Sequence, residues 1–290
     1  MIKNTLKHIK GYAMKKNGLL LSLLVLSPLS SSLAQITDIS IVNDAAKLSH
    51  GENKNIITVS EKDNSNLSHI KYDKFNVGSE GVIFNNQVGA DTIINEVISQ
   101  SVSELNGEIR IKGKQAKYTL INPNGIICTD ACSFRNIASV NLVTGKMMLA
   151  DGRVIGRSPG DAKLIIKDTT KKIANRLILN GKHIEIRNSR VKTDYLQLSN
   201  MFNHMNGSPL RNSITLDKQS TIKSNNIKLN IIDTDISNYG TINGNVNGTL
   251  LVSDIVNDGK ISGDNISFTL RDAVNVSGNG KIKFKSGQSF

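Results

Sequence analysis

The 290-residue sequence contains no Trp, only 4 Pro and only 2 Cys, and aromatic residues make up 4% of it. Sustained apolar repeats at the 3.6-residue spacing of an amphipathic helix are also scarce. Instead, apolar and polar residues alternate in short runs such as residues 108–112, 182–187 and 226–231. Alternation is typical of half-buried β-strands, and the intervening Gly, Asn and Asp residues are typical of turns. The sequence therefore predicts an all-β protein. Residues 161–179 depart most from this pattern and allow a short helical turn.

The N-terminal region lacks a long hydrophobic segment. The apolar run at residues 19–29 is 11 residues long, whereas a transmembrane helix needs about 20, so a membrane anchor is the weaker alternative. Small residues follow at Ser32 and Ala34, in the −3 and −1 positions of a cleavage site. Five lysines and no acidic residue precede the run: Lys3, Lys7, Lys10, Lys15 and Lys16. The pattern predicts a secretory signal at residues 1–34, handled by the Sec machinery and cleaved near Ala34.

Acidic residues are in the minority, with 24 Asp and Glu against 36 Lys and Arg. Removal of the five signal lysines lowers the net charge from +12 to +7. The densest basic cluster lies at residues 163–176, without the interleaved aromatic residues that nucleic-acid binding favours. We therefore expect no nucleic-acid partner, and we interpret the charge as a contribution to solubility or a mild attraction to anionic surfaces.

The two cysteines, Cys128 and Cys132, lie four positions apart. In an oxidising compartment a nearby pair usually forms a disulfide. A zinc site is the alternative, but zinc takes about four ligands and the nearest histidines in the sequence are His69 and His183. We predict a disulfide and no metal site.

The C-terminal half contains an internal repeat. The pairs 221–222, 241–242, 260–261 and 281–282 recur at spacings of 20, 19 and 21 residues, and each ends in Ile. A period near 20 with several short strands is typical of a β-solenoid, in which stacked coils bury a shared core. A β-sandwich, with strands every 8–12 residues, is the alternative that we disfavour. Asn238, Asn257 and Asn279, near the turns, are expected to form a side-chain ladder.

A series of short blocks occurs in a fixed order between residues 67 and 146. The blocks are residues 68–77, 81–86, 94–97, 105–107, 121–126, the two cysteines, Phe134 with Asn136, and residues 142–145. In order and spacing they resemble the secretion domain, or haemagglutination activity domain, of two-partner-secretion exoproteins. That group includes filamentous haemagglutinins, haemolysins and contact-dependent inhibition proteins. Many adhesins of the family carry a second Asn-Pro-Asn-Leu motif at this point. The segment 87–94 is too short to contain that motif, and in this respect the chain is more similar to the haemolysin or inhibition branch. Ile70 stands where family members usually carry Asn.

The resemblance implies a right-handed parallel β-helix with an N-terminal cap and extra-helical hairpins. Residues 35–160 would be the secretion domain, and residues 161–290 further coils continuous with it. The POTRA domains of a dedicated outer-membrane β-barrel transporter would recognise the chain in the periplasm, and the chain would fold at the cell surface. The final activity would be that of an adhesin, a cytolysin or an inhibition toxin acting on a host or neighbouring cell.

Two groups of residues carry the expected site. One is the motif for transporter recognition or folding, whose sequence fits a type I turn: Asn122, Pro123, Asn124 and Gly125. The other is a block typical of the family: Asn95, Glu96 and Val97. We predict neither catalysis nor a cofactor.

Three other interpretations have less support in the sequence. A polysaccharide-degrading β-helix enzyme would need clustered carboxylates, and only Asp233, Asp235 and Asp254 suggest one. A haem-binding exoprotein of the same export route would need an axial His or a Cys-Pro pair, and no Cys-Pro occurs. A catalytic role for His69 would need an acid and a nucleophile beside it, which the sequence does not indicate.

Overall fold

The structure, a computed structural model, describes residues 37–51, 54–150, 153–200 and 211–285. The chain divides into two units, residues 1–33 and 34–290, and all described residues belong to the second. The predicted signal and its cleavage site lie outside the described residues. Within them every regular element is a β-strand, and no helix could cross a membrane.

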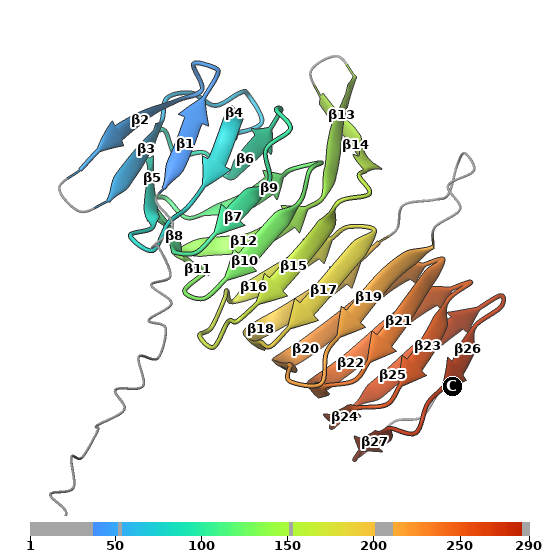
Figure 1. The fold of residues 1–290 in the computed structure, drawn as a ribbon. Helices are drawn as coiled ribbons and strands as arrows, with labels where there is room; N and C mark the ends of the chain where they lie inside the picture. Colours follow the sequence, from blue (N-terminus) through green and yellow to red (C-terminus); the bar gives the residue numbers. More distant parts are fainter. Residues whose placement is uncertain (1–36, 52–53, 151–152, 201–210, 286–290) are drawn as a thin grey trace, which may run out of the picture. The chain divides into compact units, whose positions relative to one another are not determined.

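Three sheets contain most of the strands (Figure 1). Sheet A has twelve: β1 (Asp38–Ile41), β4 (Leu67–Asn76), β6 (Thr92–Val97), β9 (Ala116–Ile121), β12 (Ile137–Val143), β16 (Arg176–Asn180), β18 (Arg190–Ser199), β20 (Thr221–Ile232), β22 (Thr241–Leu251), β24 (Lys260–Gly263), β25 (Ile266–Arg271) and β27 (Lys281–Phe284). Sheet B has five: β2 (Ala46–His50), β3 (Asn55–Val59), β5 (Val82–Asn86), β8 (Glu108–Gly113) and β11 (Ser133–Arg135). Sheet C has eight: β7 (Ser103–Leu105), β10 (Ile126–Thr129), β15 (Lys163–Lys167), β17 (His183–Arg187), β19 (Asn212–Leu216), β21 (Thr234–Asn238), β23 (Asp254–Asn257) and β26 (Asn275–Ser277).

The chain visits the sheets in turn and so forms coils. In one coil β9 belongs to sheet A, β10 to sheet C and β11 to sheet B, before β12 returns to sheet A beside β9. Strands of successive coils pair in parallel, as a β-helix requires. At the N-terminal end β1 pairs antiparallel with β4, and β2 pairs antiparallel with β3. These strands cover the first edges of sheets A and B and form the predicted cap.

One hairpin lies outside the three sheets. Strands β13 (Gly145–Ala150) and β14 (Arg153–Pro159) pair only with each other. The hairpin follows β12 directly and leads into β15, where the coil resumes. The prediction of a parallel β-helix with an N-terminal cap is therefore confirmed, and of the predicted extra-helical hairpins the described residues contain this one. The short helical turn allowed at residues 161–179 is wrong, because the segment contains β15, the start of β16 and irregular backbone between them, with no helical residue.

The C-terminal repeat corresponds to strand register. Ile222 pairs with Ile242, Ile242 with Ile261, and Ile261 with Ile282, so the repeating pairs lie one coil apart. The asparagine ladder is confirmed for one step, because Asn238 Nδ2 donates to Asn257 Oδ1 at 2.6 Å. It is wrong for Asn279, which is exposed and donates only its backbone N–H, to Asp258.

The core of the N-terminal coils is aromatic. Tyr72, Phe75, Phe84, Tyr118 and Phe134 form a continuous row, with neighbouring ring centroids 4.9 to 6.3 Å apart. The first four rings have no exposed surface. Tyr72 and Phe75 both lie in β4, and the later rings come from β5, β9 and β11, so the row links β4 to the coils that follow.

Candidate functional site

The Asn-Pro-Asn-Gly segment forms the corner between β9 and β10. Gly125 N–H donates to Asn122 O at 3.4 Å and closes a four-residue turn. Asn122 Oδ1 accepts from the backbone N–H of Asn124 at 2.9 Å, which fixes the turn from inside. Gly125 has a φ of 120°, in the region that favours glycine. The four residues thus form a rigid local unit before any contact with the next coil is considered.

This turn is stacked on the corner of the preceding coil, between β6 and β7. Asn122 is fully buried, and its Nδ2 donates to Ser101 O and to Ser103 Oγ, both at 2.9 Å. Asn124 Nδ2 donates to Ser99 O at 2.6 Å. The amide groups of the motif are therefore used within the fold, and they join two successive coils at one corner.

The next coil packs against the other side of the turn. A side chain at Gly160 would place its Cβ 2.8 Å from Pro123 O, so only glycine fits without displacement. The backbone N–H of Asn122 donates to Val143 O, which lies one coil further on. The turn is enclosed between two neighbouring corners, and only Pro123 and Asn124 keep partial exposure.

The Asn95-Glu96-Val97 block lies in β6, where successive side chains alternate between the core and the surface. Asn95 is buried, accepts from Tyr72 Oη at 2.8 Å and donates to Thr119 O at 3.2 Å. Burial raises the pKa of the Tyr72 phenol well above its ordinary value, so the phenol stays a hydrogen-bond donor. Val97 packs in the core. Asn95 thus connects three successive strands of sheet A.

Glu96 has a surface partner that the sequence interpretation missed. His69 Nε2 lies 2.8 Å from Glu96 Oε2, across the parallel pair β4 and β6. The neighbouring Ser68 is buried on the opposite face of β4, so His69, Glu96 and Ser68 do not form a nucleophile arrangement. The 25-residue spacing between paired residues of β4 and β6 is the signal that could have revealed this contact.

Cys128 and Cys132 lie at the next corner, between β10 and β11. The structure joins them in a disulfide with the Cα atoms 5.4 Å apart, and both side chains are buried. The backbone N–H of Cys132 donates to Thr129 O at 2.9 Å, which closes a turn inside the bridge. Sulfur atoms bonded to each other are not available as thiolate ligands for zinc.

We expect the purified, unreduced protein to carry no free thiol. In denaturant, a thiol reagent should detect no thiol before reduction. After reduction it should detect two, one from each cysteine. A Cys128→Ser variant is the matched control and should show one thiol without reduction. Two reactive thiols in the unreduced protein would contradict the bridge.

The three carboxylates considered for an enzyme converge on one cation. Arg211 nitrogens lie 3.1 Å from Asp233, 2.9 Å from Asp235 and 2.5 Å from Asp254. The hydrogen bond from Arg211 lowers the pKa of Asp254, and the same contact raises the pKa of Arg211. Carboxylates that are charge-paired in this way are poor proton acceptors, so the cluster is better explained as an ion network between coils. Among the described residues no group of three or more His, Cys, Asp or Glu could hold a metal ion.

Parallel coils around an apolar core, an antiparallel cap and a hydrogen-bonded corner motif together define a capped parallel β-helix. The chain belongs to the TPS secretion domain family, whose model matches residues 34–284. The predicted family is therefore confirmed, and it is defined by secretion and not by a chemical reaction.

Known relatives and one solved structure agree with this placement. A tRNA nuclease CdiA from Yersinia mollaretii is 34% identical over 151 residues, covering 45% of this chain and 5% of that protein. A hemolysin from Proteus mirabilis is 33% identical over 141 residues, covering 42% of this chain and 8% of that protein. The crystal structure of a filamentous hemagglutinin secretion domain superposes with a TM-score of 0.71 at 18% identity, over 86% of this chain and 97% of that one. The chain thus spans less than a tenth of the length of these two relatives, and the solved structure supports the fold alone.

Proposed function

We propose that the chain acts as the export module of a two-partner-secretion exoprotein. The Sec machinery would move it into the periplasm, with cleavage near Ala34, and the POTRA domains of an outer-membrane β-barrel transporter would bind it there. An extended segment that adds to an exposed strand is the expected mode of that binding. The family match over residues 34–284 is the observation that carries the proposal.

Folding outside the cell would drive the export. Each coil adds hydrogen bonds and apolar contacts to the preceding coil, so completed coils resist return through the transporter. The cap provides the first edge on which later coils pair. Pairing of β10 with β15 and of β12 with β16 supports one continuous unit for residues 35–160 and 161–290. The module itself would have no catalytic role, and a haemolysin, adhesin or inhibition activity would belong to the full-length protein.

Deletion of the cognate transporter tests the proposal. We expect the extracellular amount of the chain to fall at least tenfold, with accumulation or degradation in the periplasm, as measured by immunoblotting of fractions. A form without residues 2–34 is the control and should stay in the cytoplasm in both strains. Unchanged secretion without the transporter would refute the proposed route.

A further inference from the structure

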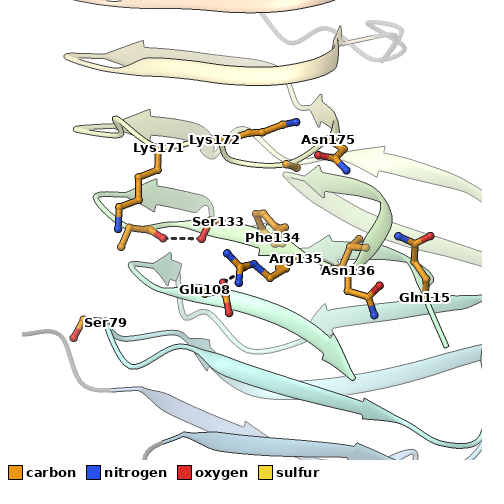
Figure 2. A pocket seen from close by; sticks show the side chains of 13 residues that line it. Ser79, Glu108, Gln115, Ser133, Phe134, Arg135, Asn136, Lys171, Lys172 and Asn175 are labelled. Atoms are coloured by element: carbon orange, nitrogen blue, oxygen red, sulfur yellow. Dashed lines mark hydrogen bonds and ion pairs between the residues drawn. The ribbon is translucent and has the colours of Figure 1, made fainter. Parts of the chain in front are cut away.

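A concave basic surface lies where sheet B ends. In the part of the chain that the structure describes, β11 is the last strand of sheet B. Residues 168–175 pass over its edge, linked by a 2.7 Å hydrogen bond from Phe134 N–H to Ile173 O. A pocket of about 810 Å³ lies beside this edge. Figure 2 shows Lys171 and Lys172 on one side of the pocket and Arg135 with Glu108 on the other.

Lysines continue from this pocket along successive coils. Lys172 pairs in register with Lys192, and Lys192 pairs with Lys223. Each step is one coil, about 4.8 Å, and the alternating burial of β18 and β20 directs Lys192 and Lys223 outward. We call Lys172, Lys192 and Lys223 the lysine column. Like charges directly opposite each other on paired strands destabilise a sheet, so the fold alone does not account for this arrangement.

Nearby carboxylates do not balance the positive charge. Glu108 is shared by three cations, since its oxygens lie 3.7 Å from Lys54, 3.1 Å from Arg110 and 3.2 Å from Arg135. Lys172 pairs with Asp194 at 2.8 Å. Among the described residues, Lys171, Lys192 and Lys223 have no ion-pair partner. The surface therefore presents the unpaired ammonium groups of Lys171, Lys192 and Lys223 next to a cavity, whereas Asp194 neutralises Lys172.

The geometry points to an acidic polysaccharide as the ligand of this surface: we propose that its anionic groups bind Lys192 and Lys223 of the lysine column while a sugar unit enters the pocket. Gln115 and Asn175 also line the pocket, and their neutral amide groups can donate hydrogen bonds to sugar hydroxyls and accept hydrogen bonds from them. The amide nitrogen of Asn136 donates within the fold, to Ile111 O. Phe134 is buried, so the site lacks the exposed aromatic platform of a single-stranded nucleic-acid site. The proposal does not depend on the transporter, because it concerns the folded chain.

Binding to three polysaccharides tests the ligand class: dextran, dextran sulfate and a phosphomannan, each titrated against the folded chain. We expect no binding to neutral dextran, and binding to at least one charged polymer that weakens as salt is raised. Preference for the phosphomannan would indicate a phosphorylated bacterial surface glycan, and preference for dextran sulfate a sulfated glycan of a target cell. Tighter binding of polyglutamate or of single-stranded DNA would overturn the proposal.

Two charge-matched variants separate this site from general attraction. A Lys192→Gln/Lys223→Gln variant should lose about tenfold in affinity, since it removes two charge-assisted contacts. A Lys117→Gln/Lys228→Gln variant loses the same charge at two exposed positions of sheet A and should change affinity less than twofold. The first variant should also unfold at the same or a higher temperature than the wild type, because like-charge repulsion is relieved. Equal losses of affinity in the two variants would overturn the site.

Discussion

Replacing Phe84 with Ala is expected to lower the free energy of unfolding by about 3–5 kcal/mol, as loss of a large buried side chain usually does. Phe84 is fully buried and stands between Phe75 and Tyr118, at 6.3 and 5.5 Å between ring centroids. The substitution leaves a cavity between the cap and the first complete coils, where both neighbouring rings lose an aromatic contact. Urea unfolding followed by circular dichroism measures the effect, since the chain has no Trp for fluorescence.

Phe284→Ala is the matched control for this prediction. Phe284 keeps 37% of its surface exposed, so the same truncation should cost less than about 1 kcal/mol. In a solenoid each coil contacts only its neighbours. Amide hydrogen exchange in the Phe84 variant should therefore accelerate most in β5, β8 and β9, and least in β22 and β25. If amide exchange accelerated equally along the whole chain, the result would contradict a local effect of the aromatic row on stability.

The later coils could be predicted from the sequence because their period is short and nearly constant. The Ile residues at 222, 242, 261 and 282 recur every 19 to 21 positions, and each spacing equals one coil of the structure. For Asn279 the repeat period predicts the wrong position. The last coil is longer than the preceding one, so Gly278, not Asn279, lies against the backbone of Asn257. A shift of one residue places a side chain on the opposite face of the strand.

The first coils were harder to predict because their contacts depend on register between long, dissimilar strands. Tyr72 and Asn95 meet in the core, and His69 and Glu96 meet on the surface, yet no repeated residue marks either pair. Gly107, in the block at residues 105–107, is required for a steric reason that the sequence does not reveal. A Cβ there would lie 2.0 Å from Gly78 O, so two corners pack too closely for any side chain. The lysine column was also invisible in composition, because net charge says nothing about placement.

Replacing Asn122 with Ala is expected to reduce both stability and export. The substitution removes the donor to the half-buried Ser101 O and to the buried Ser103 Oγ. A buried group left unpaired costs about 1–3 kcal/mol. It also removes the acceptor for Asn124 N–H, so the turn itself loosens. Asn226→Ala, at an exposed position of sheet A, makes the same chemical change and should alter neither property. Urea unfolding and the extracellular fraction of the chain are the two measurements.

Pro123→Ala then separates folding from recognition as the role of the motif. Pro123 is partly exposed and its side chain makes no hydrogen bond, so the contacts of Asn122 and Asn124 survive the substitution. If the corner serves folding, export should follow stability: near normal in Pro123→Ala and strongly reduced in Asn122→Ala. If the transporter reads the motif as a sequence, Pro123→Ala should block export while the purified protein stays stable. The enclosure of the turn between two neighbouring coils favours the first outcome, because most of its polar groups are already bonded within the fold.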